Sequence, residues 1–330
     1  GERSVMPGGD VALGSEQHRL LYRIAQAYYL DGLTQKQIAN RFGLSRPTVS
    51  RLLQRGRATG VISITLIPPP NGLADLERQL EQRYGLAEAV IVPVRDPEDR
   101  AAVVRDLGPA AAECLVRSIS GHEIIATAWG TSILAMVDAL PFRSWNGVTV
   151  VQMLGGLGPV DALEHSTELT QRIAQKLGAK LRLLPAPGIV STQATAEALK
   201  SNPQIDRVLD LAAEADIALV GLGVPAPDSL LVRSGTILSQ QDLERLQEAQ
   251  AVGDIALRYL DAAGTTLDLE INSRLIGLAI DQISRIPRVI GIAGGVLKHN
   301  IIRAALRSHI LDVLVTDVGT AQVLLEEQVR

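Results

Sequence analysis

Aromatic residues and cysteine are scarce in this chain of 330 residues. Phe, Tyr and Trp make up only 3% of it, so a core must be built from aliphatic side chains, and hydrophobic residues of all kinds reach 46%. The one cysteine, Cys114, leaves no partner for an internal disulfide or for a metal site of several thiolates. We expect it to be a small buried hydrophobic residue.

Long apolar runs are absent as well. No stretch approaches the roughly 18 apolar residues of a membrane-spanning helix. The sequence also lacks the charged start followed by an apolar segment that would indicate secretion. We therefore expect a soluble cytoplasmic protein that does not contact the membrane, and the length favours two domains.

Motifs for nucleotides and metals are missing too. Neither Gly156–Gly158 nor Gly221–Gly223 is followed by the third glycine of G-x-G-x-x-G, and no G-x-x-x-x-G-K-[ST] pattern occurs. No histidine–carboxylate spacing is typical of a metal site, and we interpret His165 and His299 as solvated or hydrogen-bonded side chains. The sequence therefore predicts no metal and no cofactor.

Charge is unevenly divided along the chain. The formal net charge is -4, but residues 15–60 hold eight basic residues against Glu16 and Asp31, which gives them +6 and leaves -10 for the rest. A small basic module on an acidic body indicates that only the first part meets a polyanion. The eight basic residues are Arg19, Arg23, Lys36, Arg41, Arg46, Arg51, Arg55 and Arg57.

The basic module shows the pattern of short helices. Apolar residues recur at three- and four-residue steps over residues 16–30, which predicts a first helix. Thr34, followed three residues later by Gln37, resembles a capping box and predicts a second helix that ends at Gly43. Ser45 predicts the cap of a third helix, with Pro47 in its first turn, where the missing N–H costs nothing.

Two short helices joined by a turn around a glycine are typical of a helix-turn-helix, whose second helix presents its N-terminal residues to the major groove. Arginine can pair with guanine, and hydroxyls or helix N-termini can reach bases or phosphates. The alternative is a generic three-helix bundle with a solvated basic face. We predict contacts with double-stranded operator DNA from Thr34, Gln35, Ser45, Arg46, Pro47, Thr48, Ser50, Arg51 and Arg55.

A strand and a stiff connector are expected to follow the third helix. Residues 60–66 alternate like a strand, which predicts a small wing. Pro68–Gly72 can be neither helix nor interior strand and reads as a linker. We therefore expect a small helical (winged) helix-turn-helix domain at residues 15–67, a linker at 68–72 and a second domain at 73–330, which begins with a helix to about residue 84.

The second domain alternates apolar, strand-like runs with amphipathic stretches. Continuous apolar strands separated by helices predict an α/β domain, a mostly parallel sheet with helices on both faces. We predict strands at 89–93, 123–128, 148–154, 181–185, 217–221, 289–292 and 313–316, and helices at 100–120, 131–140 and 166–177.

Glycine-rich turns follow several predicted strands, where ligands collect in such sheets. The first of them, Gly130-Thr131-Ser132, combines close backbone approach, two hydroxyls and the free N–H groups of the next helix, which together suit a phosphate. The other turns hold Gly155 and Gly156, Gly221 and Gly223, and Gly294 and Gly295.

The order of motifs resembles the SorC family of sugar-responsive bacterial transcriptional regulators over nearly the whole chain. The motifs are LTQKQIANRFGLSRPTVSRLLQRGR, AWGTS, QMLGGLG, DIALVGLG, VGDIALRYLDAAG, GIAGGVLKHNIIRAALR and VLVTDVGTAQVLL. The resemblance implies an effector domain similar to sugar-phosphate isomerases and glucosamine-phosphate deaminases, a phosphorylated sugar or polyol as effector, and a homodimer or homotetramer.

The same resemblance implies roles for single residues. Gly130, Thr131 and Ser132 correspond to a phosphate loop, and Gly155 and Gly156 to the pocket lining. Asp254 corresponds to a carboxylate for sugar hydroxyls, and Lys298 to a cation at the opposite end of the ligand. Some relatives carry an arginine where this chain has Leu154, so a second phosphate on the ligand stays open.

Two other functions remain possible for the second domain. A sugar-phosphate isomerase or deaminase with an accessory DNA-binding module would need a carboxylate base beside the substrate carbon, for which Asp254 and Asp317 are the candidates. A pure oligomerisation platform would bind no effector. We expect a sensor without catalytic residues, in which effector binding favours one arrangement of the subunits.

Overall fold

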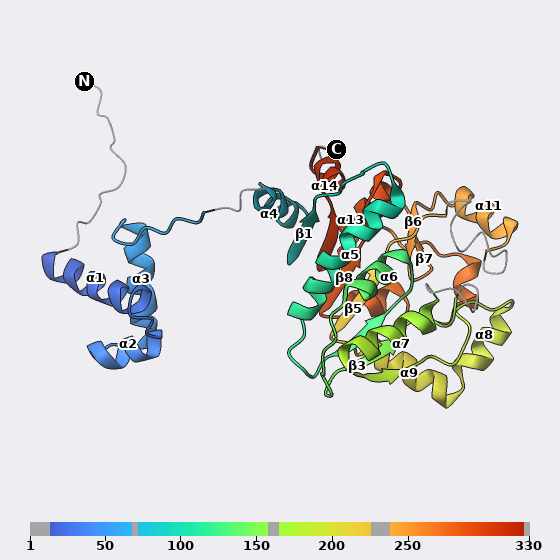
Figure 1. Cartoon of the computed structure of the whole chain (residues 1–330), viewed down its shortest axis with the longest axis horizontal. Coiled ribbons are helices and arrows are strands. Elements are labelled where there is room, and N and C mark those ends of the chain that lie inside the picture. The colour runs from blue at the N-terminus through green and yellow to red at the C-terminus, as the bar shows by residue number, and fades with distance from the viewer. Residues whose placement is uncertain (1–13, 68–71, 158–164, 226–237, 327–330) are drawn as a thin grey trace, which may run out of the picture. The chain divides into compact units, whose positions relative to one another are not determined.

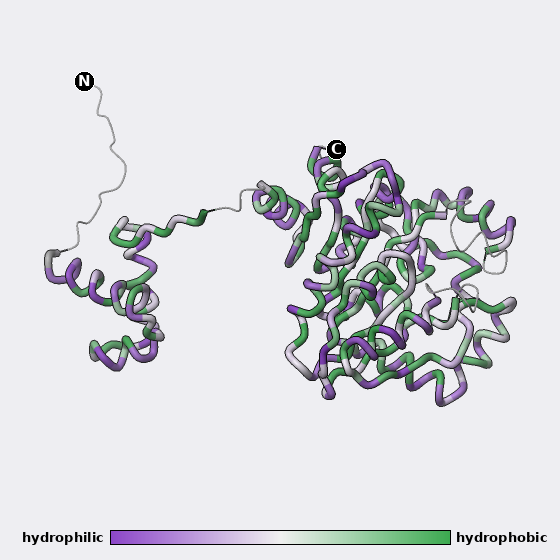
Figure 2. The backbone as a smooth tube through the Cα atoms, viewed as in Figure 1, coloured by the Kyte–Doolittle hydropathy of each residue, from purple (hydrophilic) through white to green (hydrophobic). Residues whose placement is uncertain are grey.

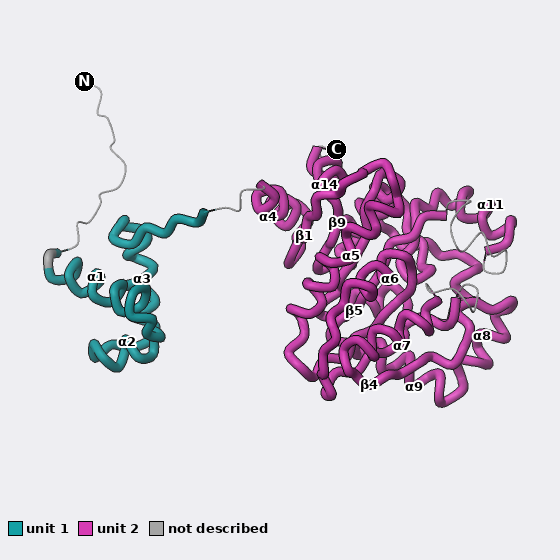
Figure 3. Tube along the Cα trace, in the orientation of Figure 1, with its two compact units in different colours: residues 1–68 teal, residues 69–330 magenta. Residues whose placement is uncertain are grey.

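The computed structural model describes residues 14–67, 72–157, 165–225 and 238–326. The chain divides into two compact units, the N-terminal unit of residues 1–68 and the C-terminal unit of residues 69–330 (Figure 3). Most of the predicted linker, residues 68–71, lies outside the described residues.

The described part of the N-terminal unit, residues 14–67, forms three helices, as predicted: α1 (Ser15–Tyr29), α2 (Gln35–Phe42) and α3 (Arg46–Ala58). Each helix contributes one apolar stripe to a common small core, because side chains three and four residues apart share a helix face. Ile24, Ile38 and Val49 are fully buried in it, one from each helix.

Local hydrogen bonds set the limits of α2 and α3. Thr34 and Gln37 form the predicted capping box, in which the Gln37 amide donates to Thr34 Oγ1 at 3.2 Å and the Thr34 amide to Gln37 Oε1 at 2.8 Å. Gly43 ends α2 in the left-handed conformation, with φ 67°. Ser45 then caps α3, since its Oγ accepts from the Thr48 amide at 3.3 Å.

The predicted wing strand at residues 60–66 is wrong. No strand forms among the described residues of the N-terminal unit, and a lone strand has no ladder partner for its backbone groups. Ile62 instead packs against Gly56 of α3. A Cβ added at Gly56 would lie 2.6 Å from Ile62 Cδ1, so a contact this close requires glycine at that position. Ile64 and Leu66 are 56% and 84% exposed.

The C-terminal unit is built on a seven-stranded sheet in which every neighbouring pair is parallel, with the order β1-β9-β8-β5-β2-β3-β4 (Figure 1). All five residues of β9 and four of the five in β5 are buried, as the apolar runs predict. The strands are β1 (Glu88–Val92), β2 (Ile124–Thr127), β3 (Thr149–Gln152), β4 (Lys180–Arg182), β5 (Ile217–Gly221), β8 (Arg288–Ile292) and β9 (Val313–Asp317).

Helices cover both faces of this sheet. Crossovers from β1 to β2, β3 and β4 run in one direction along the sheet, and those from β4 to β5, β8 and β9 return in the other. Since such crossovers are right-handed, α5, α6 and α7 lie on one face and α9 and α13 on the other. These helices span Arg100–Arg117 (α5), Thr131–Ala139 (α6), Ser166–Leu177 (α7), Pro203–Ala213 (α9) and His299–Arg307 (α13).

Further helices, a hairpin and two short 3-10 helices complete the described part of the C-terminal unit. Hydrophobic and hydrophilic residues alternate along the outer helices, as one-sided burial requires (Figure 2). Cys114 of α5 is fully buried, as predicted. The other elements among the described residues are α4 (Leu73–Tyr84), α8 (Gln193–Lys200), α11 (Gln240–Glu248), the antiparallel hairpin β6 (Gly253–Ile255) and β7 (Arg258–Leu260), η1 (Glu270–Arg274), α12 (Ile280–Ser284), η2 (Val296–Lys298) and α14 (Val318–Glu326).

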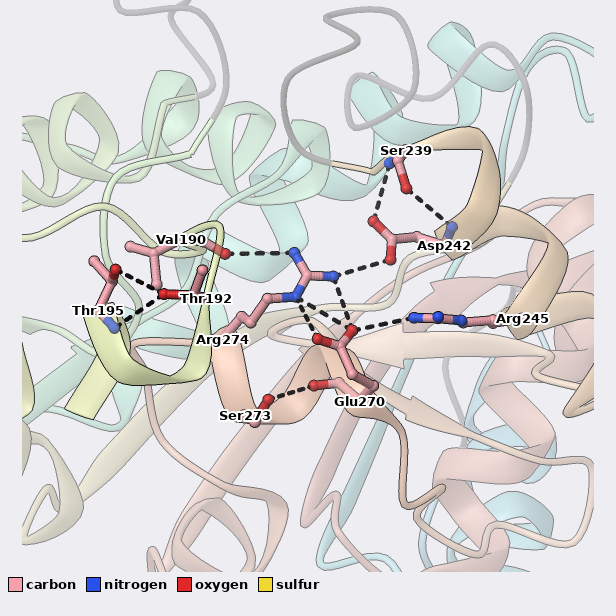
Figure 4. Close-up of polar contacts among 9 residues, drawn as sticks. All are labelled: Val190, Thr192, Thr195, Ser239, Asp242, Arg245, Glu270, Ser273 and Arg274. Carbon is pink, nitrogen blue, oxygen red and sulfur yellow. Dashed lines mark hydrogen bonds and ion pairs between the residues drawn. The ribbon is translucent and has the colours of Figure 1, made fainter.

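A polar network joins α11, η1 and the loop before α8 (Figure 4). The Arg274 guanidinium donates to Asp242 Oδ1 at 2.9 Å, to Glu270 Oε1 at 3.0 Å and to the Val190 carbonyl at 3.4 Å. Asp242 also closes the capping box of α11 with Ser239. The side chains of Arg274 and Asp242 are only 13% and 8% exposed, so each charge is stabilised mainly by protein partners and little by solvent.

Candidate functional site

The first predicted site lies at the start of α3. Arg46, Ser50 and Arg51 are exposed in the first two turns of α3, and Arg55 is exposed near its end; the N-cap of the helix is Ser45. Pro47 occupies the first turn, as expected. An exposed helix start that carries two arginines and a serine has the form of a major-groove reader.

Several predicted DNA contacts also hold the fold together. Thr34 and Ser45 each use their hydroxyl to cap a helix, and Ser45 Oγ lies 2.7 Å from Thr48 Oγ1. Gln35 begins α2, so its amide is among the first N–H groups of that helix, which suit a phosphate. We did not anticipate that Arg57 bonds to Tyr29 Oη at 3.2 Å, which turns this arginine toward α1.

The second predicted site lies at the carboxyl edge of the parallel sheet. Strands β2 and β5 are neighbours, but their following crossovers leave in opposite directions. Such a switch point opens a crevice beyond the strand ends, because the two connecting segments separate there. The loops after β2, β5 and β8 meet at this point.

A cavity of about 660 Å³ occupies the crevice, which is within the range of small-molecule sites. It is lined by nine of the eleven residues predicted to contact the ligand, although they come from four separate motifs. The nine are Gly130, Thr131, Ser132, Gly221, Gly223, Asp254, Gly294, Gly295 and Lys298.

The loop after β2 supplies free amides to this cavity. Gly130 has φ 131°, a conformation that side-chain-bearing residues rarely adopt, and it leads directly into α6. The N-cap of α6, Gly130, has no side chain that could cap the helix, so the first N–H groups of the helix, at Thr131 and Ser132, point along its axis toward the cavity. The positive end of the helix dipole adds to this preference for an anion.

Two opposite charges stand in the cavity wall. Lys298 donates through Nζ to the Leu222 carbonyl, and burial lowers the pKa of this lysine although Asp254 favours its charged form. Asp254 is 4% exposed, and burial raises the pKa of its carboxyl group. Its Oδ2 accepts from the Leu257 amide at 3.1 Å, while its Oδ1 has no hydrogen-bond partner among the residues that the structure describes.

Gly223 makes room for that carboxylate. The backbones of Gly223 and Asp254 are bonded to each other at 2.9 and 3.0 Å, which brings the hairpin β6–β7 against the loop after β5. A Cβ on Gly223 would lie 2.2 Å from Asp254 Oδ1. The absence of a side chain at Gly223 therefore leaves space for the carboxylate beside the loop after β5.

Gly155 and Gly156 do not line this cavity. A Cβ on Gly155 would lie 2.4 Å from the Pro187 carbonyl oxygen, so close backbone packing requires glycine there. The amides of both residues are used inside the protein, donating to the Ile276 and Ala186 carbonyls at 2.9 Å each. The segment after them, residues 158–164, lies outside the described residues.

The two histidines near these turns are hydrogen-bonded and do not line the cavity. His165 caps α7 by accepting from the Thr167 amide at 3.2 Å, and burial lowers its pKa. His299 Nε2 lies 3.1 Å from Thr320 Oγ1. Asp317, one of the two carboxylates considered as a base, accepts from the Gly295 amide and from Thr320, and it does not line the cavity either.

The sequence did not point to one wall of the cavity. Helix α5 contributes Asp99, Arg100 and Arg105, and Trp129 and Leu297 add apolar surface. Asp99 caps α5 through the Ala101 amide at 3.0 Å. No motif marks these residues, because tertiary packing of α5 against α6, β9 and β1 brings them to the crevice.

Among the described residues, no group of three or more His, Cys, Asp or Glu side chains is arranged to hold a metal ion. None of the described helices combines the length and the apolar composition that a bilayer crossing needs.

Comparison with known proteins gives a family match for each of the two units. The sugar-binding domain family (Sugar-bind) matches residues 68–326, and the MarR family matches residues 13–68. The chain is 32% identical to the deoxyribonucleoside regulator of Bacillus subtilis, covering 94% of this chain and 99% of that protein. It is 34% identical to the transcriptional regulator LsrR of an Enterobacter species, covering 95% and 94%.

A solved structure shows the same architecture. The full-length sorbitol operon regulator SorC from Klebsiella pneumoniae superposes with a TM-score of 0.71 at 29% identity, covering 94% of this chain and all of that one. A helix-turn-helix unit joined to a sugar-binding domain makes this protein a sugar-responsive, DNA-binding transcriptional regulator. The chain belongs to the SorC family of sugar-binding bacterial transcriptional regulators.

Proposed function

We propose that the cavity binds a phosphorylated sugar or polyol and that this ligand controls operator binding. The observation that carries the proposal is the union, in one cavity, of the uncapped start of α6, the cation of Lys298 and the unpartnered buried Oδ1 of Asp254. Helix amides and a lysine suit a phosphate, and an acceptor-only carboxylate suits hydroxyl groups.

The residue roles follow from these contacts. Thr131 and Ser132 offer amides and hydroxyls to the phosphate, and Lys298 adds a positive charge. Asp254 receives hydroxyl groups of the sugar or polyol, while Gly221, Gly223, Gly294 and Gly295 allow close approach of the backbone.

We propose that the protein acts without catalysis. Its relatives are named as regulators, and Asp317 is already occupied by the Gly295 amide and Thr320. Asp254 remains the candidate base of the rival hypothesis, a sugar-phosphate isomerase or deaminase. Turnover of sugar phosphates by the purified protein, lost in Asp254→Ala, would establish the rival.

We also propose that the regulator is a homodimer or homotetramer that binds chromosomal DNA in the cytoplasm. Paired helix-turn-helix units read two half-sites about one helical turn apart. Effector binding would then change the spacing of the α3 helices, provided that the ligand binds the two arrangements unequally.

A thermal-shift screen tests the effector. Sugar phosphates and polyol phosphates are compared with the same compounds lacking phosphate, and a true effector at 100 times its Kd is expected to stabilise the protein by about 2.7 kcal/mol. Stabilisation by the unphosphorylated compounds alone would overturn the phosphate assignment. No stabilisation by any of them would favour the oligomerisation platform.

The affinity for such a ligand is expected to fall at both high and low pH. Because burial lowers the pKa of Lys298, its charge is lost at a lower pH than that of a free lysine, so affinity falls earlier as pH rises. Because burial raises the pKa of Asp254, its carboxylate is protonated at a higher pH than usual, so affinity also falls earlier as pH drops. Calorimetric titrations across the pH range check this, and Asp254→Asn should remove the Asp254 part of the acid limb while leaving that of the ligand phosphate.

For the DNA half, Arg46→Ala is expected to weaken binding to an operator selected from a random library by about 1–3 kcal/mol if Arg46 reads a base. Arg55→Ala serves as the matched variant on the same helix, since a phosphate contact should weaken specific and random DNA alike. Fluorescence anisotropy with both DNAs measures the two losses. An equal loss for Arg46→Ala on random DNA would make Arg46 a phosphate contact.

A further inference from the structure

Helix α14 is tied at its start to the wall of the cavity. It follows β9 without an intervening loop, and Asp317, the last residue of β9, is 4% exposed. Asp317 Oδ1 accepts from the Gly295 amide at 2.8 Å and from Thr320 Oγ1 at 2.6 Å, and its Oδ2 accepts from the Thr320 amide at 3.0 Å. One buried carboxylate thus joins the cavity loop to the first turn of α14.

The Gly294–Gly295 loop and Asp317 pack too closely to move independently of each other. A Cβ on Gly294 would lie 2.4 Å from Asp317 Oδ1, so the loop and the carboxylate are in direct contact. Both Gly294 and Gly295 line the cavity. A shift of this loop must therefore move Asp317 or break its hydrogen bonds.

At its other end, α14 is tied to α4. The last carbonyls of a helix have no partner within it. Here Leu324 O accepts from Tyr84 Oη at 2.7 Å, and Leu325 O accepts from Arg83 Nη1 at 2.7 Å. Helices α4 and α14 and strand β1 pack together at one edge of the sheet (Figure 1).

Helix α4 is in turn fixed to the outer edge of β1. Because β1 is the edge strand, the amides on its outer side have no ladder partner. Glu81 Oε1 accepts from the Ala89 amide at 3.3 Å, and Glu77 Oε2 accepts from the Ile91 amide at 3.2 Å. Helix α4 begins at Leu73, directly after the segment that leads from the N-terminal unit.

We propose that α14 and α4 form a relay that carries the state of the Gly294–Gly295 loop to the beginning of α4, and hence to the chain leading to the helix-turn-helix. Asp317, Thr320 and Tyr84 are its positioning residues. The relay rests on the proposed function in one respect, that the cavity is the effector site. Both of its helices are rigid along their axes, and both of its junctions are hydrogen bonds that a small movement makes or breaks.

Hydrogen exchange of the full chain without ligand tests the relay from both ends. Tyr84→Phe and Thr320→Val each remove one hydroxyl. Tyr84→Phe is expected to speed exchange roughly two- to tenfold in residues 293–298 as well as in 318–326, and Thr320→Val to do the same in residues 73–84. Arg78→Ala, on an exposed position of α4, is the matched control and should leave residues 293–298 unchanged.

Two results would overturn the relay. One is exchange that changes only beside each substitution, with the far end as in the wild type. The other is equal acceleration throughout the unit in Tyr84→Phe and in Arg78→Ala, which would mean general destabilisation. Because no ligand is present, failure here leaves the effector assignment intact, and failure of the thermal-shift screen leaves the relay intact.

Discussion

Lys298→Met is expected to remove about half or more of the stabilisation that a sugar phosphate gives to this protein. Methionine keeps the length of the side chain but loses its charge and its donors. A hydrogen bond to a charged group contributes about 1.5–3 kcal/mol to binding, so its loss raises Kd roughly 10- to 100-fold. At a concentration of 100 times the wild-type Kd, stabilisation should fall from about 2.7 to about 0.4–1.4 kcal/mol.

The matched control is Lys200→Met. Lys200 is also partly buried, at the end of α8, but it does not line the cavity. For each variant, the ligand response is the difference in stability with and without ligand. A loss of intrinsic stability, such as that caused by leaving the Leu222 carbonyl without its Lys298 donor, is present in both measurements and cancels. A full ligand response in Lys298→Met would place the phosphate elsewhere.

Arg274→Ala is expected to destabilise the protein by about 3–5 kcal/mol. The change leaves Asp242, whose side chain is 8% exposed, as a buried charge that keeps, among the described residues, only its hydrogen bonds with Ser239 in the capping box. Breaking a buried ion pair by removing one partner is costly for this reason. Urea unfolding of the two proteins measures the difference in the free energy of unfolding.

Arg245→Ala tests the same network at its exposed end (Figure 4). Arg245 and Glu270 are 47% and 52% exposed and lie 3.3 Å apart, so their ion pair is screened by water. Its loss should cost only about 0–1 kcal/mol. Equal losses in the two variants would show that burial of the Arg274–Asp242 pair does not decide its contribution.

Much of the fold followed from local patterns. The caps at Thr34 and Ser45 and the turn at Gly43 lie within a few residues of what they stabilise, so the sequence could predict α2 and α3 closely. The wing failed for the opposite reason. Alternation at residues 60–66 predicts a strand only if another strand pairs with it, and no local pattern reports whether that partner exists.

The candidate site also has a part that the sequence could predict and a part that it could not. Glycine turns at strand ends could be recognised from the sequence, and nine predicted residues line one cavity. Gly155 and Gly156 share that pattern, yet their amides are bonded to distant carbonyls. A glycine needed for close packing and a glycine needed for a ligand look alike in a sequence, because both are defined by what lies opposite.

By itself, the sequence determined a basic helix-turn-helix, an aliphatic parallel α/β domain and a set of anion-friendly turns, since capping, periodicity and charge act over short stretches of chain. The tertiary structure alone decided which turns meet. Strand order put β2 beside β5 and so created the crevice, and the hairpin β6–β7 brought Asp254 against Gly223. The hydrogen bonds of Tyr84 and Arg83 to the end of α14 join residues more than 200 positions apart, and only packing can establish contacts of that kind.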